Sequence, residues 1–283
     1  MFQTISGVRP SPLSGQWYPA EPEVLARQVD QLLAEGAARV PPLHGDLLGV
    51  LAPHAGIRYS GPVAGTAFAT VQGRAYRYVA VLGPMHYVYH PPLLTSAHAA
   101  YATPLGTVPV AHEVLTALDQ DLQARLGVGL TPVARDPEHS LEMEVIFLQR
   151  ALRPGFHLIP LMFRTVDPTI LEVVGKALAR LLDPARDLVV ASSDLSHYFP
   201  QAVAQRLDRE MLRRIVALKP LDVLLAEEEG IAQACGRAAI ATMLWTTLAW
   251  GATRAQLLHY ATSGDVTGDY DAVVGYAAVA VLR

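Results

Sequence analysis

Short apolar runs alternate along this chain with longer segments in which apolar residues recur at helical spacing. Runs that are apolar almost throughout predict strands that are buried on both faces of a sheet. Such runs lie at 47–52, 77–83, 157–163 and 187–192, and two further strands are expected near 256–261 and 272–281. Strands that alternate with helices favour an α/β fold, with a central, largely buried sheet and helices on both faces.

The clearest helix follows Asp167, because its carboxylate can accept hydrogen bonds from the first turn and Pro168 suits that turn. Further helices are expected at 21–35, 62–71, 141–152, 201–218 and 236–250. The first 20 residues are rich in Pro and Gly and predict an ordered arm without regular structure. No repeat, low-complexity linker or shift in composition divides the chain, so we expect residues 1–283 to form a single domain.

Composition excludes several classes of protein. The chain is 51% hydrophobic and only 17% charged, and 22 basic against 26 acidic residues give a net charge of −4. No basic surplus exists to neutralise phosphates, which argues against a nucleic-acid partner. No apolar run reaches the roughly 20 residues of a membrane span, and the first residues lack the pattern of a signal peptide. We therefore expect a cytoplasmic protein with no membrane association.

Two histidines follow predicted strands at equivalent positions. His54 comes directly after the strand at 47–52, and His86 comes after the strand at 77–83. Functional groups in open α/β sheets collect at the carboxyl ends of the strands. If these two strands are parallel neighbours, both imidazoles emerge at the same edge and could share a metal ion. The alternative is that each is a hydrogen-bonded loop histidine.

A third strand end carries Asp194 and His197, which follow the run at 187–192. At a spacing of three, one turn could place the carboxylate beside the imidazole, where it would fix the tautomer and raise its basicity. The alternative is an aspartate that caps a helix, with a histidine on the surface. A serine-hydrolase interpretation of Ser192 or Ser193 is weaker, because the chain has no G-x-S-x-G motif.

Two further segments carry candidate chemistry. Cys235, the only thiol, precedes an apolar helical stretch; at a helix N-terminus its thiolate could bind a metal, although a lone cysteine is usually a small buried hydrophobe. His139 and Glu142 lie where the helix at 141–152 begins, and Ser140 could cap that helix. The polar loop at 263–269 predicts a turn that could wall the site.

Taken together, these segments resemble the Memo-like family, known in bacteria and archaea as AmmeMemoRadiSam system protein B. The matching stretches occur in family order and span almost the whole chain. They are RPSPLSGQWY at 9–18, APHAGIRYSG at 52–61, LGPMH at 82–86, YATPL at 101–105, EHSLE at 138–142, SSDLSH at 192–197, ACGRA at 234–238 and YAT at 260–262.

The resemblance implies a fold similar to that of the class III extradiol ring-cleaving dioxygenases, which are non-haem iron enzymes. It also implies a metal pocket formed by His54, His86 and Cys235, with Asp194 and His197 at acid–base positions. His139 and Glu142 match a nearby polar patch that would support the ligands or contact substrate. The dioxygenases hold iron with two histidines and one carboxylate, and iron is therefore the expected metal. A thiol in place of the carboxylate is a softer ligand, so copper and zinc are alternatives.

Three functions are compatible with these residues. The first is a redox enzyme that uses iron or copper to act on an unidentified small molecule, with His197 moving a proton. The second is a module that binds phosphopeptides in the same pocket without catalysis, as has been linked to eukaryotic relatives. The third is a zinc-dependent hydrolase. The resemblance also implies a functional association with a radical-SAM protein and an AMMECR-type protein.

Overall fold

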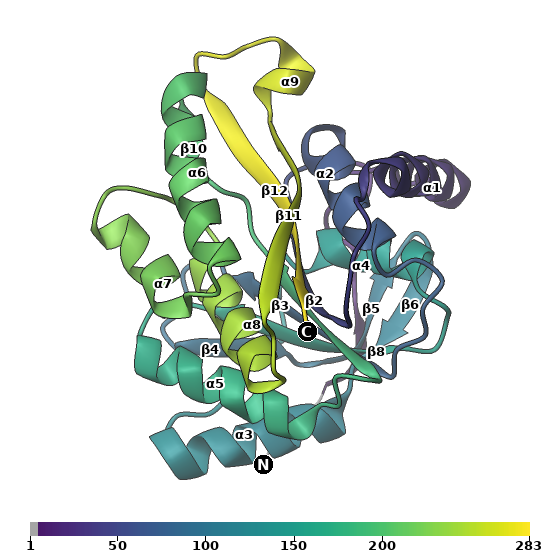
Figure 1. Ribbon diagram of the computed structural model, residues 1–283. Coiled ribbons are helices and arrows are strands. Elements are labelled where there is room, and N and C mark those ends of the chain that lie inside the picture. Colours follow the sequence, from purple (N-terminus) through teal and green to yellow (C-terminus); the bar gives the residue numbers. More distant parts are fainter. Residues whose placement is uncertain (1–4) are drawn as a thin grey trace.

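The structure is a computed structural model that describes residues 5–283 and shows one α/β domain (Figure 1). Within these residues, nine strands form one mixed sheet in the order β10-β12-β2-β9-β3-β8-β4-β7, with β11 paired to β12 outside this path. Helices pack on both faces of the sheet, as its uniformly buried strands predict. The expected fold class is confirmed.

Four parallel strands make the centre of the sheet, and three of them begin and end where the apolar runs predict. They are β2 (Leu47–Ala52), β9 (Asp187–Ser192), β3 (Tyr78–Pro84) and β8 (His157–Phe163). The flanking strands are β10 (His197–Phe199), β12 (Val273–Leu282), β11 (Arg254–Thr262), β4 (Leu93–Ser96) and β7 (Thr131–Val133). Some of these strands are too short or too exposed to show a clear apolar pattern, so the sequence does not predict them.

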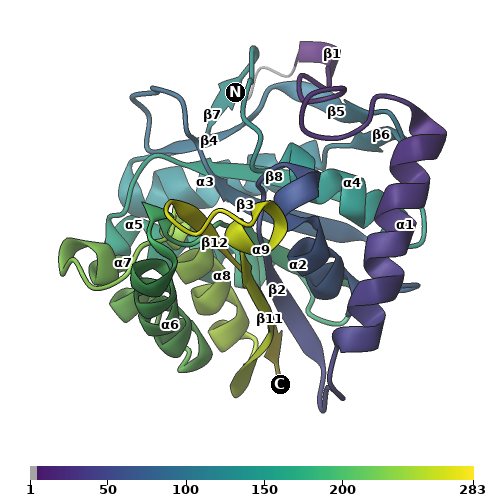
Figure 2. The same ribbon diagram turned by 90° about the horizontal axis from the view of Figure 1, so that it is seen from above.

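Two groups of helices cover the two faces (Figure 2). One group packs around α2 and the other around α8 and α5. The first contains α1 (Pro22–Arg39), α2 (Ile57–Ala69) and α4 (Glu142–Ala151). The second contains α3 (His112–Leu126), α5 (Pro168–Leu181), α6 (Gln201–Val216), α7 (Pro220–Glu228) and α8 (Arg237–Ala249). The four-residue α9 (Gly264–Thr267) lies in the loop before β12.

Of two residues predicted to cap helices, one does so and the other does not. Asp167 caps α5 as expected, because its carboxylate accepts hydrogen bonds from the backbone N–H groups of Thr169 and Ile170. Ser140 does not cap α4. Its hydroxyl instead donates to the carbonyl oxygen of Pro84 at the end of β3, 2.8 Å away. Ser140 thus ties the start of α4 to the edge of the sheet at which β3 ends.

The N-terminal arm is more regular than its composition predicts. β1 (Ile5–Arg9) pairs in parallel with β5 (His98–Thr103), which pairs with β6 (Gly106–Pro109) in a separate small sheet. Arg9 is fully buried, and its guanidinium donates to the carboxylates of Asp136 at 2.7 Å and Glu142 at 2.5 Å. A buried cation with two carboxylate partners anchors the arm, a contact that no local pattern could reveal.

The strand order corrects one premise of the sequence analysis. β2 and β3 are not neighbours, because β9 lies between them and pairs in parallel with both. All three strands still end at the same edge. The segment that follows β9 therefore emerges between the residues that follow β2 and those that follow β3, so three loops build one site. None of the described helices combines the length and apolar character needed to cross a membrane.

Candidate metal centre

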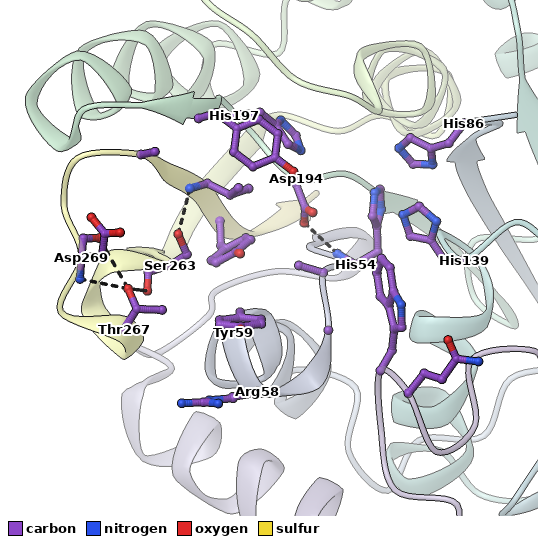
Figure 3. Close-up of a pocket in the computed structure, with 18 residues that line it drawn as sticks. His54, Arg58, Tyr59, His86, His139, Asp194, His197, Ser263, Thr267 and Asp269 are labelled. Atoms are coloured by element: carbon purple, nitrogen blue, oxygen red, sulfur yellow. Dashed lines mark hydrogen bonds between the residues drawn. The ribbon is translucent and has the colours of Figure 1, made fainter.

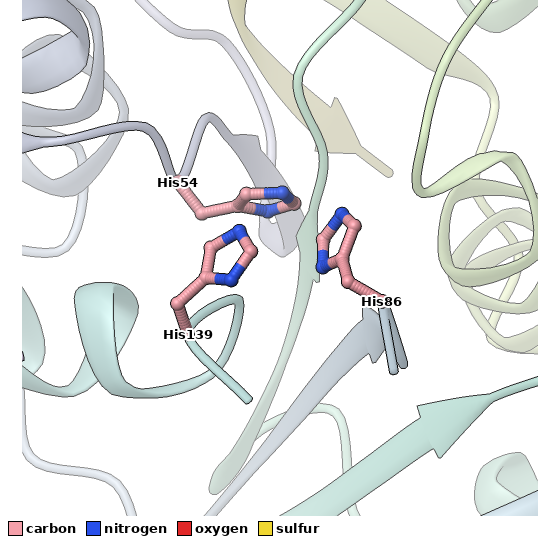
Figure 4. A group of neighbouring side chains, drawn as sticks. All are labelled: His54, His86 and His139. Carbon is pink, nitrogen blue, oxygen red and sulfur yellow. The ribbon is translucent and has the colours of Figure 1, made fainter. Parts of the chain in front are cut away.

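Three imidazoles meet at the carboxyl ends of the central strands (Figure 4). His54 follows β2, His86 follows β3, and His139 lies in the segment that leads into α4. One ring nitrogen from each lies within 4.8 Å of the others. Each element reaches the same edge, so a group spread over much of the sequence becomes compact enough to hold one metal ion.

Glu138 fixes the orientation of His86. One carboxylate oxygen lies 2.8 Å from Nδ1 of His86, and the other accepts its backbone N–H at 2.6 Å. The carboxylate also accepts the backbone N–H groups of His139 and Ser140. Burial alone would raise the pKa of Glu138, but the hydrogen bonds and charge of His86 and the charge of His139 lower it to about 2. Because an ionised Glu138 accepts from Nδ1, Nε2 of His86 is left for a metal.

His54 is held in the same way by different groups. Its Nδ1 lies 2.8 Å from Oγ of Ser192, the last residue of β9, and its backbone N–H donates to Asp194 at 2.9 Å. Burial, followed by the charges of His139 and His86, lowers the pKa of His54 well below its usual value. A neutral His54 that donates from Nδ1 presents the lone pair of Nε2.

His139 completes the group and packs against the N-terminal arm. Its ring centroid lies 4.3 Å from that of His86, with the rings nearly parallel, and 4.5 Å from the ring of Trp17. Burial lowers the pKa of His139 to about 4, against the opposing charge of Glu138. The imidazole is therefore neutral near pH 7, as a metal ligand must be.

Glu142 lies away from the pocket, within the contacts that hold the arm. Its carboxylate is completely buried and accepts hydrogen bonds from Arg9, Ser11 and Tyr18. It touches none of the three histidines through a hydrogen bond in the described part of the chain. Its place in the structure is to secure the arm that carries Trp17.

Cys235, the third ligand implied by the resemblance, lies beside His54 but is not a member of the group of three histidines. Its Sγ is 3.3 Å from Nε2 of His54. Two ligands of one tetrahedral metal at ordinary bond lengths are about 3.6 Å apart, so this pair could share an ion. Gly236 lets the segment that carries Cys235 lie close to the end of β9, because a Cβ at this position would be only 2.4 Å from the carbonyl oxygen of Ser192.

The surroundings of Cys235 favour the neutral thiol unless a cation is bound nearby. Burial and the nearby charge of Asp194 raise the pKa of its thiol well above the usual value. A bound metal reverses such a shift, because a coordinating thiol loses its proton. Cys235 precedes α8, as the sequence predicts, and a thiolate there also faces the positive end of that helix.

Asp194 and His197 both reach the pocket, but no hydrogen bond joins their side chains within residues 5–283. The residues between them are irregular, and His197 opens β10, so a spacing of three does not produce a helical turn here. Asp194 instead supports the backbone of His54. Burial raises its pKa to about 7, against the hydrogen bonds from His54 and Ala55, which places its titration near neutral pH.

The three histidines lie at one end of a pocket of about 820 Å³ (Figure 3). Figure 3 shows Arg58, Tyr59 and the loop of Ser263, Thr267 and Asp269 away from the histidines, on the other side of Asp194. Aromatic rings contribute much of the wall. They belong to Trp17, Tyr59, Tyr198 and Tyr276. The loop at 263–269 forms a wall, as expected, and the pocket suits a small molecule.

Several residues of the site had no clear signal in the sequence. Glu138 adjoins His139 but is not among the residues predicted for the site, although a carboxylate next to a candidate ligand is a common support for metal-binding histidines. Trp17 lies in the arm, far from any predicted strand end. Glu144 lies inside α4 and contacts Ser192 rather than a histidine. The position of Glu138 next to His139 is a signal that the sequence does contain. The places of Trp17 and Glu144 in the site depend on how distant segments pack.

The donor set fits a transition metal. Three imidazoles converge, and for His54 and His86 Nδ1 is engaged by a neighbouring oxygen, which is the usual arrangement around histidine ligands. A thiol lies next to the same group. Imidazole and thiolate ligands suit iron, copper or zinc rather than magnesium or calcium.

Comparison with known proteins agrees with the motifs. A sequence model of the Memo-like protein family matches residues 9–280. A MEMO1 family protein of Methanopyrus kandleri is 35% identical, with 96% of this chain and 98% of that protein covered. A relative from Methanosarcina barkeri is 33% identical, with 97% and 100% covered, and one from Methanothermobacter thermautotrophicus is 32% identical, with 95% and 99% covered. This chain belongs to the Memo-like family.

Proposed function

We propose that this protein is a metal-dependent redox enzyme that binds iron, or alternatively copper, and acts on an unidentified small molecule. The observation that carries the proposal is the convergence of His54, His86 and His139 at one end of a pocket wide enough for a substrate. Iron or copper would supply one-electron chemistry and a Lewis-acidic centre to this site. The resemblance to extradiol dioxygenases supports redox chemistry over hydrolysis by zinc.

The protein's own groups would bind the substrate and move protons. Trp17, Tyr59 and Tyr276 offer apolar ring faces on which an organic substrate can pack. His197 lines the same pocket, and burial lowers its pKa, so its neutral ring can accept a proton at neutral pH. Asp194, with a pKa of about 7, is a second group that can exchange a proton there.

Two ligand sets are possible, and both contain His54 and His86. They differ in the third ligand. The histidine group supplies His139, whereas the family resemblance supplies Cys235. We propose Cys235, because its Sγ already lies near Nε2 of His54 and a cation would turn its thiol into a strong ligand. His139 would then support the site and contact substrate beside Trp17.

Metal content and absorption spectra test this proposal. Protein purified anaerobically without added metal should contain close to one equivalent of iron or copper, and His54→Ala should lose it. Cys235→Ser should lose the thiolate-to-metal absorption band of the copper or iron form, whereas His139→Ala should retain that band. Equal metal content in the wild type and His54→Ala would exclude this site. If the band survives in Cys235→Ser, Cys235 is not the third ligand, and His139 would take its place.

Substrate and partners require separate tests. Aerobic turnover of catechol-like compounds by the wild type, and its loss in His197→Ala with metal retained, would support the redox proposal. A cytoplasmic association with a radical-SAM protein and an AMMECR-type protein is proposed from the family resemblance, and co-purification from the native organism tests it.

A further inference from the structure

A second cavity, of about 310 Å³, meets the histidine pocket at His86, the one described residue that lines both. It lies where β3 and β8 end and α8 begins. Its walls include Met85, Phe163, Arg164, Glu227, Cys235 and Arg237. Cys235 lines this cavity and not the histidine pocket. The carboxyl edge of parallel strands is the usual place for a ligand in an α/β sheet, and this cavity occupies a part of that edge that the histidine pocket leaves free.

Two guanidinium groups line this second cavity, which we call the arginine cavity. Arg164 donates to the carbonyl oxygen of Met85 at 3.1 Å and takes part in no ion pair within residues 5–283. Arg237 pairs with Glu227, but its Nε is buried without a hydrogen-bond partner among the described residues. The cavity is therefore lined by two cations and one carboxylate, which pairs with Arg237 alone, and one buried donor of Arg237 has no acceptor among the described residues.

The surroundings of Arg237 favour an added negative charge. Its side chain is only 18% exposed, and a buried N–H donor such as its Nε is costly to leave without an acceptor. The first turn of α8 contains no acidic residue that would offset the positive end of the helix. Both arginines line the cavity, and guanidinium groups bind carboxylate and phosphate groups through paired N–H donors.

We propose that the arginine cavity binds a small oxyanion, the carboxylate or phosphate group of a second reactant, beside His86 and Cys235. The volume fits a small molecule and not a folded partner. A ligand there would approach the thiol and His86 without passing through the histidine pocket. The site could thus receive two different molecules, one through each cavity. This inference does not depend on which metal the centre holds or on which reaction it performs.

Calorimetric titration with inorganic phosphate tests the proposal on the full-length protein as purified. We expect saturable binding that weakens about tenfold or more in Arg164→Gln and in Arg237→Gln, because each loses a charge-assisted hydrogen bond. Glu227→Gln should tighten binding, since it removes the competing carboxylate. Arg58→Gln, an arginine of the histidine pocket, is the matched control and should bind as the wild type does. A parallel titration with acetate separates phosphate from carboxylate recognition.

Thermal unfolding gives a second measurement, which covers the case that Arg237→Gln folds poorly. Phosphate should raise the thermal midpoint of the wild type, and Arg164→Gln should abolish this increase. Arg164 is exposed and pairs with no carboxylate, so its loss should leave the fold intact. Phosphate binding that is unchanged in both arginine variants, or that is lost in Arg58→Gln instead, would overturn the proposal.

Discussion

Two glutamates support the candidate metal centre from neighbouring regions, and their surroundings are opposite. Glu138, in the loop before α4, accepts hydrogen bonds from the backbone N–H groups of His86, His139 and Ser140 and contacts the His86 ring. Glu144, in the first turn of α4, is equally buried. Among the described residues its carboxyl group has a hydrogen bond only with Ser192, and its Oε2 has no partner.

The difference shows how partners, and not burial, set the charge of a carboxyl group. The partners of Glu138 lower its pKa to about 2 despite burial, so it is ionised. Burial raises the pKa of Glu144 well above its usual value, and Asp194 nearby adds to the shift. One histidine is thus held by an anion, and the other is held through a serine beside a carboxyl group whose ionisation burial disfavours.

A neutral Glu144 also explains the hydrogen bonds of Ser192. The Ser192 hydroxyl lies 2.6 Å from both the carbonyl oxygen of Ser140 and the carboxyl group of Glu144, but it carries only one proton to donate. If the protonated Glu144 donates to Ser192, the serine can donate to Ser140 and still accept from Nδ1 of His54. This pattern fixes the His54 tautomer that presents Nε2 to a metal.

The largest effect is expected for Glu138→Ala. It removes a buried anion and leaves three backbone N–H groups without an acceptor, so the free energy of unfolding should fall by about 3 kcal/mol or more. Metal affinity should fall about tenfold to a hundredfold, because His86 loses its support. Urea unfolding and metal titration measure both quantities. Stability within experimental error of the wild type would contradict the role assigned to Glu138.

The pH dependence of stability gives a second test of the charge on Glu138. The pKa of this group is lower in the folded protein than its ordinary value of 4.5, so its stabilising contribution is complete above that value. It should be lost as the pH falls from about 4.5 toward about 2. Glu138→Gln should show a shallower loss of stability over this acid range. Identical acid unfolding curves for variant and wild type would mean that Glu138 is not ionised.

Ser192→Ala should have an intermediate effect. The variant removes the group that orients Nδ1 of His54 and leaves the fold of β9 in place, so metal affinity should fall about tenfold. The thermal midpoint serves as the control, since a collapsed site would lower it sharply. Unchanged metal affinity would show that the backbone contact of His54 with Asp194 is sufficient to position the ring.

The smallest effect is expected for Glu144→Gln. An amide is neutral and can donate to Ser192 as a protonated carboxyl does, so metal affinity should stay close to that of the wild type. Because the pKa of Glu144 is raised on folding, its contribution is complete at acid pH and is lost as the pH rises. The variant should therefore equal the wild type near pH 4 and exceed its stability at about pH 8. A strong loss of stability at both pH values would mean that Glu144 is ionised.

The central strands could be predicted because each is buried on both faces and so is uniformly apolar. This pattern gave β2, β8 and β9 at their observed bounds and placed His54 and His86 at one edge. The small sheet of β1, β5 and β6 left no such pattern. Its strands are short or partly exposed, and a buried arginine anchors β1.

The sequence by itself determined the fold class, the family and the strand ends at which the chemistry gathers, because apolar periodicity and strand-end motifs are local properties. Only the tertiary structure decided that β9 separates β2 from β3, that Glu138 holds His86, and that burial raises the pKa of Glu144. Strand order, burial and hydrogen-bond partners arise between segments distant in the sequence. For that reason the charge of each carboxyl group at this centre could be assigned only once the chain was folded.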